Sequence, residues 1–198
     1  MTAAPLGPPE QWPRRLLTVA EYLELGETEY RTELVEGQLM MAPRPVPKHM
    51  EASHVLLAAI RAALPQGYRA LAEIDLNLEL APPDKPGFVR APDITVARAE
   101  AMRQVDQGGG AVRASDVLLV AEIISPGSGR MDRRIKREEY ADAGIPHYWI
   151  VDLSDPISML VCHLAGELGY ADDGEVTDTF RTTKPFPFEL DLASLAYD

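Results

Sequence analysis

The chain has 198 residues, of which 46% are hydrophobic and 25% charged, the composition of an ordinary globular protein. Its single cysteine excludes an intrachain disulfide, and no apolar run approaches the roughly 18 residues that a membrane helix needs, so we expect a cytoplasmic protein that makes no membrane contact. The net charge of -12 disfavours a protein that grips nucleic acid with its whole surface, but it allows an enzyme that touches phosphates locally or holds metal ions through carboxylates.

The N-terminal half of the chain alternates helical and extended patterns. Residues 1–13 carry four prolines and lack the apolar core of a signal peptide, which predicts a flexible N-terminal segment before one domain over 14–198. Thr18 and Glu21 form a capping-box pattern at the start of a helix. The expected elements are a helix over 19–25, a hairpin over 30–41, a helix over 48–64, a strand over 70–80, a turn over 81–91, a strand over 92–97 and a helical turn with a loop over 99–115.

The C-terminal half begins with the most apolar segment of the sequence. Residues 117–124 form a nearly unbroken apolar run, which is typical of a strand that is buried on both faces. A helix over about 132–143, a strand over 147–153 and short antiparallel strands over 157–198 follow. This order predicts an α/β or α+β fold with a mixed sheet.

Glu122 interrupts the apolar run 117–124. An unpaired carboxylate in a buried strand costs several kcal/mol or becomes neutral, so a partner is expected. A metal ion or a lysine would serve in a functional site, and a solvent-reaching strand end or an arginine pair is the plain alternative.

Asp93 is the second candidate acid. It follows Pro92 at the start of a predicted strand whose Ile94 and Val96 share one face, so its side chain is expected on the other face. A Pro-Asp pair alone is a weak signal because turns produce it often. Two carboxylates that converge from adjacent strands, however, form the usual oxygen ligand set of Mg²⁺.

The helix after the buried strand carries the basic residues. Lys136 and Tyr140 are four residues apart and lie on one face, which could look back onto the sheet. A cluster of arginines surrounds them and is interpreted either as a phosphate-binding set or as a solvated basic face; its members are Arg130, Arg133, Arg134 and Arg137.

Several of these segments together resemble the Uma2 family (DUF820) of restriction-endonuclease-like proteins. The matching residues run in the family's order over about 18–195: Tyr30 to Gly37, Pro92-Asp93, Ala121 to Ser128, Asp132 to Ala141 and Ala143 to Asp152. The block from Glu122 to Asp152 is the most specific of them. The resemblance implies a PD-(D/E)xK nuclease fold, with a central mixed β-sheet flanked by helices and additional antiparallel strands.

The resemblance also implies roles for individual residues. Asp93 matches the superfamily's aspartate and Glu122 its glutamate, but Ile124 stands where the usual lysine would be. Lys136 on the following helix is the residue that fits the lysine's role, because a flexible side chain can bring its ammonium to the same point. Glu33 matches an acidic residue of the family's first hairpin, which could carry the metal directly or through water.

These residues lead to a hypothesis of Mg²⁺- or Mn²⁺-dependent endonuclease activity on DNA. Asp93, Glu122 and the main-chain carbonyl of Ile123 would hold the metal, with Lys136 and Glu33 beside it. The arginine cluster, Tyr140 and, with less support, His49 are the expected substrate contacts. A homodimer follows by analogy with enzymes of this fold that cut two strands with two subunits.

Two alternatives remain at this stage. A catalytically inactive member of the same fold, acting as a binding or assembly module, is favoured by the net acidity and by Ile124. A glycosidase-like pair of Asp93 and Glu122 is a poorer interpretation, because it leaves Lys136 and the arginines unexplained.

Overall fold

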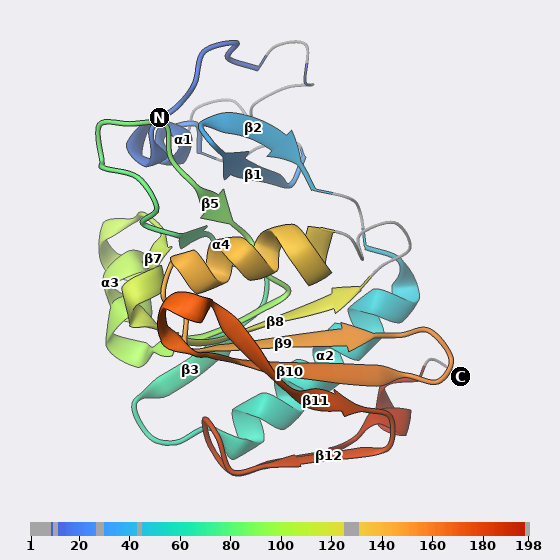
Figure 1. Cartoon of the computed structure of the whole chain (residues 1–198). Helices are drawn as coiled ribbons and strands as arrows, with labels where there is room; N and C mark the ends of the chain where they lie inside the picture. Colours follow the sequence, from blue (N-terminus) through green and yellow to red (C-terminus); the bar gives the residue numbers. More distant parts are fainter. Residues whose placement is uncertain (1–8, 10–11, 27–29, 43–44, 125–130, 197–198) are drawn as a thin grey trace.

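The computed structural model describes residues 9, 12–26, 30–42, 45–124 and 131–196, with the backbone alone at 131–133 and 167. Its strands form two mixed sheets and one separate hairpin, and Figure 1 shows the smaller sheet above the larger one. The expected mixed α and β architecture is confirmed. No helix of the described part is long and apolar enough to cross a membrane.

The main sheet has six strands in the order β11-β10-β9-β8-β6-β3, and only β8 and β9 run parallel. Its members are β3 (Tyr68–Leu71), β6 (Ile94–Arg98), β8 (Val117–Ile124), β9 (His147–Asp152), β10 (Ser158–Leu164) and β11 (Tyr170–Val176). Residues 117–124 form the predicted strand at the centre, which is buried along most of its length.

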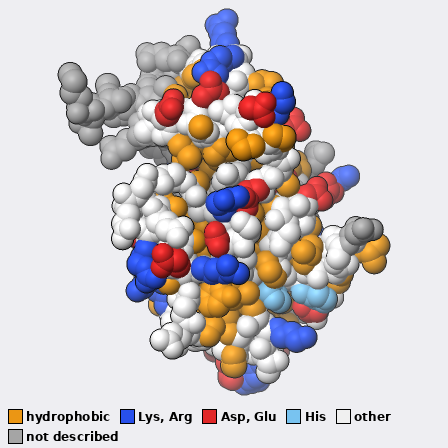
Figure 2. Space-filling view, turned by 90° about the vertical axis from the view of Figure 1, so that its left-hand side faces the viewer, with side chains coloured by type: hydrophobic (Ala, Val, Ile, Leu, Met, Phe, Trp, Pro, Cys, Tyr) orange, Lys and Arg blue, Asp and Glu red, His pale blue; other side chains and the backbone are white. Residues whose placement is uncertain are grey.

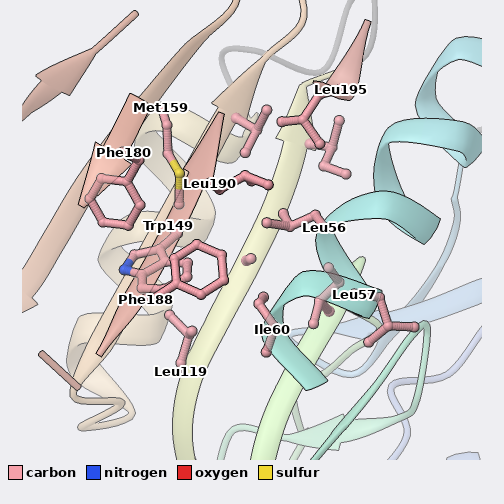
Figure 3. Packing of buried hydrophobic residues seen from close by; sticks show 14 of the residues in the cluster. Leu56, Leu57, Ile60, Leu119, Trp149, Met159, Phe180, Phe188, Leu190 and Leu195 are labelled. Atoms are coloured by element: carbon pink, nitrogen blue, oxygen red, sulfur yellow. The ribbon is translucent and has the colours of Figure 1, made fainter. Parts of the chain in front are cut away.

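One face of the main sheet packs against α2 (Pro47–Ala63) and the hairpin of β12 (Thr179–Thr182) and β13 (Phe188–Asp191). Figure 3 shows Leu56 and Ile60 of α2 facing Leu119 of β8, with Trp149 among the phenylalanines of the hairpin. This close-packed layer buries one side of β8 and holds α2 in place under the sheet.

The other face is covered by α3 (Ala99–Gly108) and α4 (Arg137–Asp142). Tyr140 of α4 is fully buried and stacks edge-to-face on Tyr148 of β9 at 5.2 Å between ring centroids. In Figure 1, α4 lies between the two sheets, so its residues can contact both.

The smaller sheet has the strand order β2-β1-β5-β4-β7 and carries α1 (Val19–Glu24). Its strands are β1 (Thr32–Val35), β2 (Gln38–Met41), β4 (Leu76–Asn77), β5 (Val89–Arg90) and β7 (Val112–Arg113). The Thr18–Glu21 capping box begins α1, and the hairpin turns at Glu36-Gly37 as expected.

The prediction of one continuous strand over 70–80 is wrong. β3 ends at Leu71, and β4 begins at Leu76 in the other sheet. Between them Glu73 has φ of 54°, and its N–H donates to Pro92 O at 3.1 Å, so the chain turns out of the main sheet there. The apolar alternation continues through the crossing because the two sheets share one core, so the sequence pattern does not mark the break between the strands.

Two other boundaries differ from expectation. The predicted turn over 81–91 contains strand β5, whose two residues are buried. The predicted helix over 132–143 begins as a wider π-helical turn, η3 (Met131–Lys136), and continues as α4. The antiparallel strands expected after residue 157 are confirmed as β10 to β13.

Candidate active site

Strand register brings the two predicted acids together. In the antiparallel pair of β6 and β8, Ile94 lies opposite Ala121, so extending the ladder by one residue places Asp93 beside Glu122. Along β8, Leu119, Ala121 and Ile123 pack in the core layer of α2, whereas Val120 packs on the other side with α4. Glu122 therefore points toward α4.

Asp93 is buried and receives hydrogen bonds from two elements. Ile123 N donates to its Oδ2 at 2.7 Å, and His49 Nε2 of α2 lies 3.1 Å from the same oxygen. Burial alone would raise the pKa of this carboxyl, but His49, the Ile123 amide and the charge of Lys136 together hold it below its usual value. Both hydrogen bonds go to Oδ2, and no described residue donates to Oδ1.

Glu122 is held by α4 and the turn before it. Its Oε1 accepts hydrogen bonds from Lys136 Nζ at 2.9 Å and from Tyr140 O–H at 2.8 Å. The Glu122 side chain is only 3% exposed and that of Lys136 11%, so this ion pair is almost fully removed from water. Burial and the neighbouring Glu122 charge raise the pKa of Tyr140 well above 10, which keeps its phenol a donor.

Glu33 of β1 completes the cluster from the smaller sheet. Its Oε2 accepts from Arg90 Nη1 at 2.7 Å and its Oε1 from Ala91 N at 3.2 Å, and Lys136 Nζ lies 4.0 Å from Oε1. Burial would raise the pKa of Glu33, but Lys136 and Arg90 outweigh it and hold the pKa below its usual value. Five predicted site residues thus gather at the junction of the two sheets and α4: Glu33, Asp93, Glu122, Lys136 and Tyr140.

His49 and Tyr140 were expected to contact substrate, and the structure gives both of them a different position. His49 is buried against Asp93, and Tyr140 is fully buried against Glu122. Each instead fixes one of the two acids in orientation.

The arginine cluster divides. Arg130 lies outside the described residues, and the structure describes only the backbone of Arg133. Arg134 is exposed beside Glu138 on the outer side of the helix. Arg137 does not join the acids, because its guanidinium binds Asp172 at 2.6 Å and Tyr170 O at 2.8 Å, both on β11. The expectation of Arg137 as a substrate contact is therefore not carried further.

The donor chemistry of the site fits a hard divalent cation. Asp93 and Glu122 offer carboxylate oxygens, and Asp93 Oδ1 receives no described hydrogen bond. Within a β-strand, the N–H and C=O of one residue point toward the same neighbouring strand. The Ile123 N–H donates to Asp93, so the Ile123 carbonyl also points toward Asp93. This position lies just beyond the last paired residues of β6 and β8. No three His, Cys, Asp or Glu side chains of the described residues form a metal-binding group, so the candidate oxygen ligands are two carboxylates and one main-chain carbonyl.

A cleft of about 370 Å³ has Arg31, Thr32 and Ala91 in its wall, and none of Glu33, Asp93, Glu122 and Lys136 is among its lining residues. Ala91 lies in its wall and also donates its N–H to Glu33, which links the cleft to the acids. Arg31 lines the same cleft and binds Glu73 at 2.8 Å. Figure 2 shows acidic and basic side chains interspersed over one face of the molecule.

Arg90 is the main residue of the site that the sequence analysis missed. It was assigned to a turn, although it stands between Val89 and Ala91, directly before the Pro92-Asp93 pair. An arginine enclosed by apolar residues beside a candidate catalytic acid is a usable signal for a buried ion pair. Its partners, however, lie 57 and 49 residues away in the sequence.

Comparison with known proteins places this site in a family. The Uma2 family model, described as "Putative restriction endonuclease", matches residues 19–193, so the chain belongs to the Uma2 family.

A solved structure supports the same fold. A protein from Anabaena variabilis ATCC 29413, described as a "putative nuclease belonging to DUF820", aligns with a TM-score of 0.66 and 21% identity over 90% of this chain and 97% of that chain. At this identity the likeness shows the fold alone. Among curated proteins, none matches this chain significantly.

Proposed function

We propose that this protein is a metal-dependent endonuclease that hydrolyses phosphodiester bonds of DNA. The proposal rests on the convergence of Asp93, Glu122 and Lys136 at one point of the fold, from three elements that are distant in sequence. The nuclease descriptions of the family and of the Anabaena protein agree with this assignment.

Asp93, Glu122 and the carbonyl of Ile123 would hold Mg²⁺ or Mn²⁺. Such an ion stabilises charge on the scissile phosphate and lowers the pKa of water toward neutrality. His49 orients Asp93 and helps to hold its pKa below the usual value, and Tyr140 orients Glu122 with its hydrogen bond. The chain therefore supplies carboxylate oxygens in fixed orientations, which suit a hard cation.

Lys136 supplies the positive charge of the proposed site. Its ammonium lies 2.9 Å from Glu122 and 4.0 Å from Glu33, so its charge is fixed between two carboxylates. From there it can orient the attacking water or donate to a phosphate oxygen as negative charge develops. Glu33, which was expected near the metal, already binds Arg90 and Ala91 N, and we assign it the role of holding Lys136.

DNA is proposed as a transient substrate, because a net charge of -12 does not support long residence on a polyanion. The exposed guanidinium of Arg134 is available for phosphate contact, which positions a duplex without reading its sequence. Two chains in a homodimer would bring one site to each strand, and light scattering coupled to size exclusion measures that association directly.

The experiment is plasmid cleavage with Mg²⁺ or Mn²⁺, in which the variants Asp93→Asn, Glu122→Gln and Lys136→Met are compared with wild type. Matched controls remove the same charges at exposed positions: Asp106→Asn, Glu138→Gln and Lys85→Met. We expect about a 10³-fold loss in each site variant, equivalent to several kcal/mol of transition-state stabilisation, and no loss in the controls. Equal cleavage by wild type and the site variants would refute the proposed site.

One observation favours a second candidate function, that of a non-catalytic binding or assembly module. The acids are nearly buried, and Lys136 pairs with Glu122 directly, so the site is self-neutralised without a metal. This alternative predicts no metal-dependent nicking and no rise in Tm on adding millimolar Mn²⁺. A cation that binds only the native state must raise the Tm.

A further inference from the structure

Arg90 is the most deeply buried cation of the described chain, with 2% of its surface exposed. All three nitrogens of its guanidinium donate hydrogen bonds to two carboxylates. Nε and Nη2 donate to the two oxygens of Glu139 on α4, each at 2.7 Å, and Nη1 donates to Glu33 on β1 at 2.7 Å. This planar fork is specific to arginine, because a lysine ammonium cannot serve both acids with this geometry.

Both carboxylates that bind Arg90 belong to residues close to Lys136. Glu139 is three residues after Lys136 on the same helical segment, and Glu33 lies 4.0 Å from the lysine ammonium. Lys136 is the last residue of η3, which continues directly into α4, so Lys136 and Glu139 belong to one helical segment. The six residues of α4 are thus tied to the smaller sheet by Arg90 and to the main sheet by the bond from Tyr140 to Glu122.

Arg90 also lies on the segment that carries Asp93. β5 ends at Arg90, and the chain passes through Ala91 and Pro92 to Asp93 at the start of β6. One guanidinium therefore joins the strand that leads to the first acid with the helix that delivers the ammonium.

We infer that Arg90 is a positioning residue, which fixes Lys136 over Glu122 by clamping α4 through Glu139 and Glu33. The inference rests on the proposed nuclease function and deepens it. It assigns no contact with substrate to Arg90. The consequence is that loosening this clamp displaces the ammonium while the groups that would hold the metal stay in place.

The test uses Arg90→Lys, which keeps the charge and removes the fork, and Glu139→Gln, a milder change should the first variant fold poorly. Glu138→Gln, with the same charge change at an exposed neighbouring position, is the control. Because a displacement of about 1 Å can cost 10²-fold in rate, we expect kcat to fall about 100-fold in both variants. KM and the affinity for Mn²⁺, measured by titration, should not change.

A double-variant comparison separates positioning from general destabilisation. If Arg90 acts through Lys136, adding Arg90→Lys to Lys136→Met causes no further loss of the residual kcat. Losses that multiply, or a kcat that is unchanged in the single variants, would overturn the inference.

Hydrogen exchange decides the structural part without any activity. We expect the amides of α4 to exchange at least about tenfold faster in Arg90→Lys while those of β9 and β10 are unchanged. If wild type cleaves no DNA, the nuclease proposal fails, whereas faster exchange confined to α4 still supports the clamp. Unchanged exchange in α4 overturns the clamp, whatever the outcome with DNA.

Discussion

Replacing Lys136 with methionine should destabilise the metal-free protein, because the buried carboxylate of Glu122 loses its ammonium partner. The Glu122 side chain is 3% exposed and loses an ammonium at 2.9 Å, keeping the Tyr140 hydroxyl at 2.8 Å. Breaking a buried ion pair costs 3–5 kcal/mol when one charge is left uncompensated, and the surviving hydrogen bond places our expectation near the lower end, at about 3 kcal/mol. For a chain of this size that corresponds to a Tm decrease of roughly 6–12 °C.

The assay is urea unfolding of the metal-free protein at neutral pH, with Lys85→Met as the control for losing an exposed lysine that pairs with Asp84. The control should stay within about 0.5 kcal/mol of wild type. The double variant Lys136→Met with Glu122→Gln should recover most of the loss, because it also removes the buried carboxylate charge that the ammonium faced. A Lys136→Met protein as stable as wild type, or a double variant with no recovery, would refute this reasoning.

Three further predictions concern neighbouring groups. Burial alone lowers the pKa of His49, but Asp93 outweighs it, so NMR titration of the metal-free protein should give a midpoint above 6.5, falling below 6.5 in Asp93→Asn. The stability from this pair is therefore complete below pH 6.5 and is lost as pH rises through the raised pKa; a pH-independent difference between wild type and Asp93→Asn from pH 5 to 9 would contradict this. Tyr140→Phe removes one bond to Glu122 and should cost about 1.5 kcal/mol in urea unfolding, so a gain in stability would contradict the assigned bond. Thr18→Ala should cost about 1 kcal/mol by loss of the helix cap while Thr18→Ser costs much less, and equal losses would argue against the cap.

The fold was predictable where burial produces a recognisable pattern in a short stretch of sequence. The apolar run of β8 and the capping box of α1 need no distant information, and both elements form as expected. The crossing from β3 to β4 was not predictable in this way. The leucines on both sides of the crossing are buried in one core, so their alternation continues although the chain changes sheets at Glu73.

The candidate site was predictable for the residues that break a local pattern. Glu122 stands out as the acid in an apolar strand, and Lys136 shares a helix face with Tyr140. Arg137 is only one residue further along, yet it faces Asp172 instead of the acids, because one step along a helix rotates the side chain by about 100°. The apolar neighbours of Arg90 are a local signal of burial, but its partners could not be identified because they belong to elements that meet only in the folded chain.

The proposed cation site consists of Asp93, Glu122 and the Ile123 carbonyl, next to Lys136. Anomalous diffraction from crystals soaked in Mn²⁺ tests it most directly. We expect one strong peak within coordination distance of both carboxylates, and no such peak in Asp93→Asn crystals. Absence of the peak in wild type, or a peak that touches neither acid, would contradict the account.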